Sequence, residues 1–226
     1  YTSFDETVYN LSNIPTKDGL IDTCLTVLND WSNYLLLTDE EIDAERGVIK
    51  EEWRTRQNGQ MRLFETSLPI TFNHSKYADR LPIGLMSVVD NFEYKALRDF
   101  YHDWYRTDLQ AIAIIGDVNV DEVEQKIIEK FSKIPAVENP RERFIVDIPE
   151  NKEMLYSLGM DPEVSTASIS FGIRHKKSLE TETVADLKKS LLESMATSML
   201  SARIREEAQK QDATILGRSE ESRIEK

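Results

Sequence analysis

Hydrophobic residues recur at helical spacing through much of the chain. Between residues 18 and 36 they fall on one helical face. Thr38, followed three residues later by Glu41, has the pattern of a capping box. These features predict one helix over about 18–36 and a second over about 39–57. Later helices are predicted around 92–104, over 119–131 and along the amphipathic stretch 182–209.

Apolar runs of strand length lie between the predicted helices. Residues 111–118 (AIAIIGDV) form a continuous apolar run, which is typical of a strand buried on both faces. In 169–173 large apolar residues alternate with small polar ones. Strands are also predicted at 1–11, 144–148 and 154–158. The stretch 57–91 is irregular, with Pro and Gly punctuation and room only for short helical turns.

The order of strands and helices predicts an α+β fold of two related domains. Each is expected to be a mixed or antiparallel sheet with helices packed on one face. Residues 138–143 (ENPRER) are charged and poor in apolar side chains, so they mark a linker. We therefore predict a first domain over 1–137, a linker and leading strand over 138–150, and a second domain over 151–226. Both domains are expected to be incomplete.

The charge balance excludes two classes of partner. The 226 residues carry a formal charge of −13, with 41 acidic residues against 28 Lys and Arg. Such a surface repels phosphate backbones and anionic lipid headgroups, so we expect neither nucleic acid nor membrane as a partner. No run of about 18 apolar residues suggests a membrane span. A single cysteine, Cys24, excludes an internal disulfide and a cysteine-based metal site.

Two glutamates on the second predicted helix share a face with apolar residues. Glu45 and Glu52 are seven positions apart, close to two helical turns, so both project among Ile42, Ile49 and Trp53. An unpaired buried carboxylate is costly, so a positive group should face them. One interpretation is a pair at the rim of the core that reaches solvent or pairs with Arg. The other is metal ligation by one Glu with support from the other.

The histidines do not complete a metal site. His74, His102 and His175 are isolated, and neither an HExxH nor an HxxEH pattern occurs. A lone histidine is more often a surface or core residue than a ligand, so none is assigned to metal. From the residues alone, the chain lacks a complete zinc site.

Several segments resemble, in order, the signatures of one peptidase family. They are 1–11 (YTSFDETVYNL), 45–53 (ERGVIKEEW), 77–84 (YADRLPIG), 100–118 (FYHDWYRTDLQAIAIIGDV) and 199–217 (MLSARIREEAQKQDATILG). The chain is similar in these segments to the insulinase and pitrilysin zinc metallopeptidases, the inverzincins of peptidase family M16, especially their bacterial members. The resemblance covers nearly the whole chain.

The resemblance implies a role for each of the two glutamates. In that family two His of an HxxEH helix and a later Glu bind zinc, and the Glu of HxxEH is the general base. Glu52 resembles the zinc ligand and Glu45 the supporting acidic residue. The HxxEH helix is expected before Tyr1, so no catalytic base is assigned within this chain. With one ligand, we expect an empty or incomplete zinc site and no activity from these residues alone.

The resemblance also implies a substrate cleft at the start of the chain. In the family, an extended peptide pairs with the edge strand at YTSF, so Tyr1, Thr2 and Ser3 are candidates for contacting substrate. A plain sheet strand is the alternative for each. The implied partners are a peptide substrate and either the rest of the same polypeptide or a homologous half that completes a chamber. Arg203 and Arg205 are not assigned to substrate, because they fit a solvated helix end.

Three functions are open at this stage. The first is part of a zinc endopeptidase for extended or unfolded peptides. The second is a non-catalytic partner subunit of the same superfamily, and the third is an acidic interaction module without peptidase ancestry. A chain that starts at Tyr1 instead of Met indicates processing, cleavage or trimming. The compartment is open between periplasm and cytoplasm, with the periplasm favoured by the resemblance.

Overall fold

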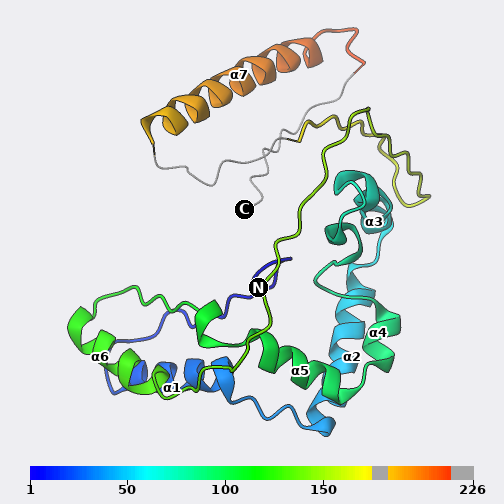
Figure 1. Ribbon diagram of the computed structural model, residues 1–226. Coiled ribbons are helices and arrows are strands. Elements are labelled where there is room, and N and C mark those ends of the chain that lie inside the picture. The colour runs from blue at the N-terminus through cyan, green and yellow to red at the C-terminus, as the bar shows by residue number, and fades with distance from the viewer. Residues whose placement is uncertain (175–182, 215–226) are drawn as a thin grey trace. The chain divides into compact units, whose positions relative to one another are not determined.

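The computed structural model describes residues 1–174 and 183–214. Two compact units, Tyr1–Ser168 and Ile169–Lys226, are considered separately below. The first contains most of the helices (Figure 1). In chain order the described helices are α1 Leu20–Asn33, α2 Asp39–Arg56, α3 Gly59–Thr71, the 3-10 turn η1 Lys76–Asp79, α4 Met86–Asn91, α5 Tyr94–Trp104, the 3-10 turn η2 Thr107–Leu109, α6 Val120–Phe131 and α7 Val184–Ala208.

Side-chain caps explain where several helices begin. The Thr38 hydroxyl accepts a hydrogen bond from the Glu41 amide at 3.3 Å, which is one half of the expected capping box. Asn119 caps α6 in the same way through the Glu122 amide, also at 3.3 Å. Each cap satisfies a backbone N–H that the first helical turn leaves without a partner. The predicted helix boundaries at α2 and α6 are confirmed.

Helix α3 lies in a stretch where the sequence predicted only short turns. Asn58 starts it by accepting a hydrogen bond from the Met61 amide at 3.0 Å. Pro69 lies inside the helix, but only in its last turn. A proline there removes one hydrogen bond near the end of the helix and leaves the preceding turns intact. The prediction of an irregular 57–91 was therefore wrong for 59–71.

The first unit has small, separate cores. Helix α3 packs against η1, and the buried residues there are Leu68, Phe72 and Ala78. Helix α1 packs against α6, and they contribute the buried side chains of Leu25 and Val123. Helix α2 packs against α4. Burial of apolar area at these contacts is the main stabilising term, with about 25 cal/mol for each Å² removed from water.

Residues 158–164 lie against the start of α3. The Arg62 guanidinium forms two hydrogen bonds with the Asp161 carboxylate, at 2.7 and 2.9 Å. The Glu163 carboxylate accepts a hydrogen bond from the Gly59 amide at 2.8 Å. The approach is so close that a Cβ on Gly59 would stand 2.6 Å from the Asp161 Oδ1 atom, so a larger residue would force the neighbouring side chains to shift. This segment is thereby part of the first unit.

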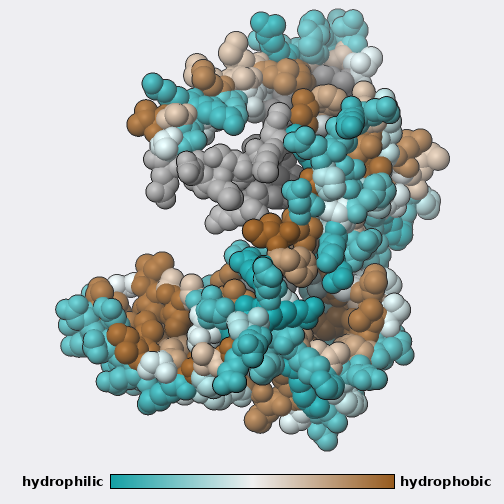
Figure 2. Space-filling view, viewed as in Figure 1, coloured by the Kyte–Doolittle hydropathy of each residue, from teal (hydrophilic) through white to brown (hydrophobic). Residues whose placement is uncertain are grey.

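The expected sheet is not confirmed within the described residues. Those residues contain no strand, and the one β-bridge joins Thr2 to Thr7. The large apolar side chains of the expected strands are exposed, for example Ile115 at 96% and Ile169 at 99%. Apolar side chains are visible on the surface in Figure 2. A strand needs a neighbour to pair its backbone, and within residues 1–174 and 183–214 the Thr2–Thr7 bridge is the one such pairing. The sheets of the predicted α+β fold therefore stay a prediction.

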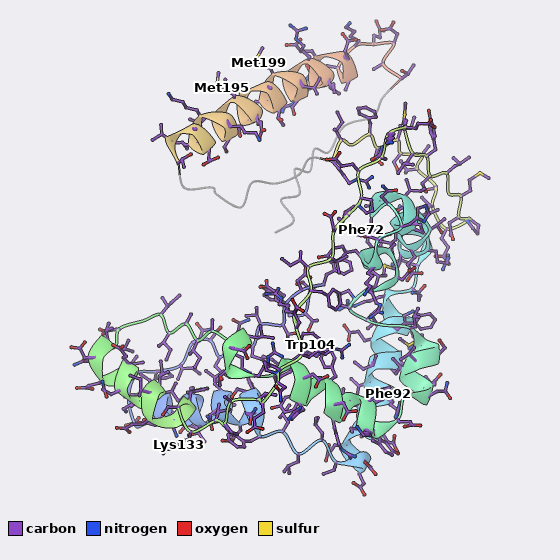
Figure 3. The ribbon with its side chains drawn as sticks, viewed as in Figure 1. Phe72, Phe92, Trp104, Lys133, Met195 and Met199 are labelled. Atoms are coloured by element: carbon purple, nitrogen blue, oxygen red, sulfur yellow. The ribbon has the colours of Figure 1, made fainter. Side chains whose placement is uncertain are left out.

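Helix α7 dominates the described part of the second unit. It begins with a complete capping box between Thr183 and Asp186, close to the predicted start at 182. Its apolar residues are exposed, including Met195 at 61% and Met199 at 62% (Figure 3). No helix in the described ranges is both long and apolar enough to cross a membrane. The domain division at 138–150 stays a prediction.

The α1–α6 contact offers a direct test of the core. Leu25 is 1% exposed, so Leu25→Ala should lower the free energy of unfolding by about 2–5 kcal/mol through lost burial and the cavity left behind. Leu36→Ala is the matched control, because Leu36 is 87% exposed and its truncation should change stability by less than about 0.5 kcal/mol. Urea unfolding followed by circular dichroism measures both. Equal stability losses would contradict the assigned core.

Candidate functional site

Arg46 fixes helix α2 against the segment that follows α4. Its guanidinium donates hydrogen bonds to the carbonyl oxygens of Val89 and Phe92, the latter at 2.7 Å. It also stacks on the Phe92 ring, 3.8 Å from the centroid. Phe92 lies at the junction of α4 and α5 (Figure 3). With its side chain only 16% exposed, Arg46 caps the end of α4 and sets the orientation of α2.

Two further polar contacts hold the same side of α2. The Asp43 carboxylate accepts hydrogen bonds from the Tyr94 hydroxyl at 2.6 Å and from Arg46 at 3.0 Å. These bonds, the one from Tyr94 first, hold the pKa of Asp43 below its usual value, and the same bond raises the pKa of Tyr94. Lys50 pairs with Asp90 of α4 at 2.7 Å.

Glu45 and Glu52 lie on a different, open face of α2. A helical projection places them within about 20° of each other, as the sequence predicts. Ile42 is buried beside them, but Trp53 is 36% and Val48 is 55% exposed, so this face opens to solvent. Glu45 is exposed, and the Glu52 side chain is 41% exposed. The two carboxylates therefore share an accessible surface and no closed cavity.

The positive group that faces Glu52 comes from the same helix. Arg56, one turn later, pairs with the Glu52 carboxylate at 2.5 Å. This matches the alternative interpretation of a rim carboxylate paired with Arg. A half-exposed pair of this kind contributes only roughly 0.2–1 kcal/mol, so it does not commit Glu52 to a structural role. The assignments of Glu45 and Glu52 stay predictions.

Within the described residues this face carries two carboxylates, Glu45 and Glu52, and no complete metal site. No group of three or more His, Cys, Asp or Glu side chains in residues 1–174 and 183–214 could hold a metal ion. His74 is exposed after the end of α3, and His102 lies on α5 near Asp103. His175 is outside the described residues. The Glu52 carboxylate is chemically suited to zinc, but a single oxygen donor cannot hold it firmly.

The opening residues form a small hairpin in place of the predicted single strand. The amino group of Tyr1 donates to the Val8 carbonyl at 3.0 Å, and the Val8 amide donates back to Tyr1 at 2.9 Å. The Ser3 amide donates to the Glu6 carbonyl at 2.9 Å and closes the turn. The candidate substrate contacts Tyr1, Thr2 and Ser3 are all exposed. Of the three, Thr2 has backbone groups that take no part in these hairpin bonds, and pairing with a peptide requires such groups.

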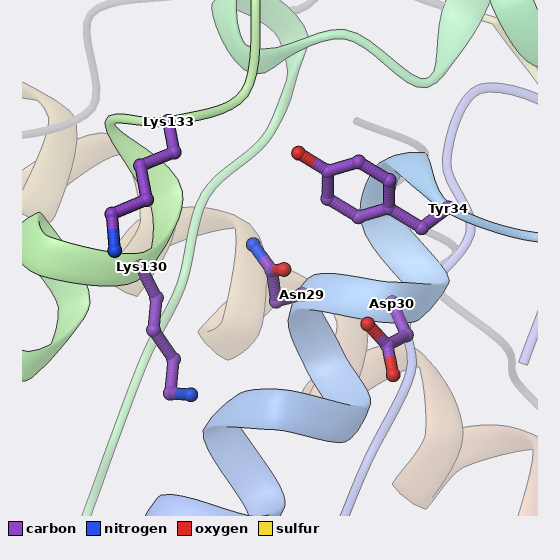
Figure 4. Close-up of a pocket in the computed structure, with 5 residues that line it drawn as sticks. All are labelled: Asn29, Asp30, Tyr34, Lys130 and Lys133. Atoms are coloured by element: carbon purple, nitrogen blue, oxygen red, sulfur yellow. The ribbon is translucent and has the colours of Figure 1, made fainter.

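An open hollow lies between α1 and α6, apart from the predicted site. It is lined by Asn29, Asp30, Tyr34, Lys130 and Lys133 (Figure 4). None of the sequence-predicted site residues is among them. Lys130 bonds the Thr26 hydroxyl at 2.9 Å, so part of the positive charge is used within the α1–α6 contact.

Arg46 is the residue of this region that the sequence did not single out. It follows Glu45 in the ERGVIKEEW segment that carries the resemblance. An arginine among carboxylates on a helix looks like a solvated residue, and only the fold brings the Val89 and Phe92 carbonyls to it. The one signal for Arg46 in the sequence was its position directly after Glu45 in the ERGVIKEEW motif.

Family models match both parts of the chain. The model described as insulinase, peptidase family M16, matches residues 1–81, and the model described as the peptidase M16 inactive domain matches residues 91–219. The second match alone covers more than half of the chain. This chain belongs to the M16 peptidase family.

Curated relatives point in the same direction. The chain is 30% identical to a probable zinc protease PqqL of Haemophilus influenzae over 209 residues, which is 91% of this chain and 22% of the relative. It is 37% identical to the probable zinc protease PqqL of Escherichia coli over 136 residues, covering 60% of this chain and 15% of the relative. The chain thus spans about a fifth or less of these relatives.

Solved structures share part of the fold. The first half of the periplasmic protease PqqL from Escherichia coli matches with a TM-score of 0.53 at 32% identity, covering 57% of this chain and 28% of that one. The ferredoxin protease FusC, solved with Arabidopsis ferredoxin, matches with a TM-score of 0.53 at 27% identity, covering 57% and 15%. Over the 57% of this chain that is covered, the fold is therefore similar to parts of these two proteases.

The Arg46 contacts can be tested by a charge-conserving substitution. Arg46→Lys keeps the charge but cannot reach both carbonyls in a fork, so it should lower the free energy of unfolding by about 1–3 kcal/mol. Arg54→Lys is the control, because Arg54 pairs only with Glu51 on the exposed surface. Urea unfolding compares the two. If Arg46→Lys were as mild as the control, Arg46 would not orient α2.

Proposed function

We propose that this chain is part of a zinc metalloendopeptidase that hydrolyses extended or unfolded peptides. Family membership supports the class of enzyme. The observation that carries the site is the placement of Glu45 and Glu52 on one accessible face of α2, within the segment matched by the insulinase model. These residues alone are proposed to be inactive.

Glu52 is proposed as a zinc ligand and Glu45 as its acidic support. Zinc in such a site polarises the scissile carbonyl and activates a water molecule for attack. The Glu52 carboxylate must first exchange Arg56 for the metal. The exchange is inexpensive, because an exposed pair within one helix is worth only about 0.3–0.5 kcal/mol. Glu45 adds negative charge on the same face and favours a dication there.

The rest of the site is proposed to come from outside these residues. Two His ligands and the general base are assigned to an HxxEH helix elsewhere in the parent protein. A homologous half, on the same polypeptide or on a second subunit, is proposed to complete the peptidase chamber. The peptide is proposed to lie along the opening residues, with Tyr1, Thr2 and Ser3 in contact with it.

A second candidate function is a non-catalytic partner subunit of the same superfamily. The match of residues 91–219 to the inactive domain of the family favours it. The catalytic form is favoured by the position of Glu45 and Glu52 within residues 1–81, which match the insulinase model. The third hypothesis, an interaction module without peptidase ancestry, is excluded by the family membership.

A periplasmic location is proposed from a relative. The Escherichia coli structure is described as that of a periplasmic protease. The same location is proposed for the bacterial parent of this chain.

Substitution of Glu52 in the full-length parent tests the proposal. Glu52→Gln keeps the shape but removes the anionic donor, so bound zinc should fall well below one per chain and peptide cleavage should drop by about 100-fold or more. Metal analysis and cleavage of a flexible fluorogenic peptide measure the two effects. Glu51→Gln is the control, because Glu51 lies on another face and pairs with Arg54. Retention of zinc and rate by Glu52→Gln would refute the assignment.

The 226 residues by themselves should bind zinc weakly. One carboxylate donor gives too little binding energy, so titration calorimetry with zinc should show no stoichiometric binding tighter than about micromolar. Glu52→Gln in this chain should leave the weak signal nearly unchanged. Nanomolar affinity for the wild-type chain would mean that further ligands are present in it.

A further inference from the structure

The first eight residues form a short turn, which we call the opening hairpin. Its bridge pairs Thr2 with Thr7, whose hydroxyl oxygens are 3.3 Å apart. The flanking backbone bonds join Ser3 to Glu6 and Val8 to Tyr1. In this arrangement the N–H and C=O groups of the bridged pair point away from the hairpin. Within the described residues, no backbone group pairs with those of Thr2, so that edge is available.

An aromatic cluster holds the tip of the opening hairpin. The Phe4 ring meets Phe72 edge-on at 5.4 Å and Tyr77 at 5.1 Å. The Tyr77 hydroxyl donates to the carboxylate of Asp5 at 2.9 Å. Phe72 is buried in the α3–η1 core, so the tip is tied to a firm part of the unit.

A second cluster holds the chain just beyond the hairpin. The hydroxyls of Tyr9 and Tyr105 are 2.6 Å apart, and the Tyr9 ring lies 5.5 Å from that of Trp31. Tyr101 stacks beside Tyr105 at 4.5 Å and donates to the Trp31 carbonyl at 2.8 Å. Burial first, and the bond to Tyr9 second, raise the pKa of Tyr105, so its hydroxyl remains protonated at ordinary pH. This cluster ties residue 9 to α1 and to the end of α5.

The two aromatic clusters fix the position of the opening hairpin, because its internal hydrogen bonds cannot do so. A single two-stranded hairpin is marginally stable at best in water. Its exposed residues bury little area, while Phe4 and Tyr9 reach the aromatic clusters on either side. Loss of either contact would leave the Thr2 edge free to change position.

We propose that Tyr77 and Tyr105 are positioning residues that hold the opening hairpin at both ends and present the Thr2 backbone edge to an extended peptide. This inference rests on the proposed peptidase function. Neither tyrosine touches the reacting atoms. Their effect is on the capture of the peptide, which needs an edge already fixed in place, since ordering it during binding would weaken affinity.

Hydrogen exchange on the 226-residue chain tests the positioning without any need for catalysis. The double variant Tyr77→Phe/Tyr105→Phe keeps both rings and removes both hydroxyls. The Ser3 and Val8 amides should then exchange about fivefold faster or more, the factor that one hydrogen bond is worth, while amides of α6 stay unchanged. Tyr34→Phe is the control, because Tyr34 lines the hollow between α1 and α6. Unchanged exchange of Ser3 and Val8 would overturn the positioning role.

Peptide cleavage by the full-length parent tests the consequence. The double variant should raise KM by about fivefold and leave kcat within about twofold, because substrate capture is weakened and the chemistry is not. Tyr34→Phe should change neither. A lower kcat with unchanged KM would overturn the inference. A wild-type parent that retains zinc but cleaves no peptide would refute the proposed function, whereas the exchange measurement would still decide whether the tyrosines hold the hairpin.

Discussion

The orientation of α2 depends on one arginine that satisfies the end of a neighbouring helix. The last carbonyls around α4 have no helical partner, and the Arg46 fork supplies donors to Val89 and Phe92 while its plane covers the Phe92 ring. With Asp43 bonded to Tyr94 on the same side, one face of the helix is committed to packing. Glu45 and Glu52 therefore remain on another, open face of α2, where a metal or another chain can reach them.

The segments at the two ends of the first unit are also held in place by side-chain contacts. Residues 158–164 are held on α3 by Arg62 and two carboxylates, at a place where Gly59 allows close approach. The opening hairpin is held by aromatic rings and tyrosine hydroxyls. Neither segment belongs to a helix or a named strand. Their positions depend on a few polar contacts to helices that are themselves packed, which concentrates the sensitivity to mutation at Arg62, Tyr77 and Tyr105.

The helices were the predictable part of the fold. Caps at Thr38 and Asn119 and the spacing of apolar residues are local signals, so α2 and α6 were located closely. Helix α3 was missed because Pro69 looks like a breaker when its position within a helix is unknown. The strands were a different problem. Alternation in 169–173 shows that the segment suits a sheet, but pairing needs a partner strand, and the described residues provide none.

The sequence by itself determined the starts of α2 and α6, the family and the shared face of Glu45 and Glu52, because each depends on residues that are near one another along the chain. Tertiary structure alone decided that this face is open and that Arg46 binds carbonyls some forty residues away. It also turned the opening residues into a hairpin held by Tyr77 and Tyr105. These outcomes depend on contacts between distant segments. The residue pattern of one segment does not show which of its faces a second segment will pack against.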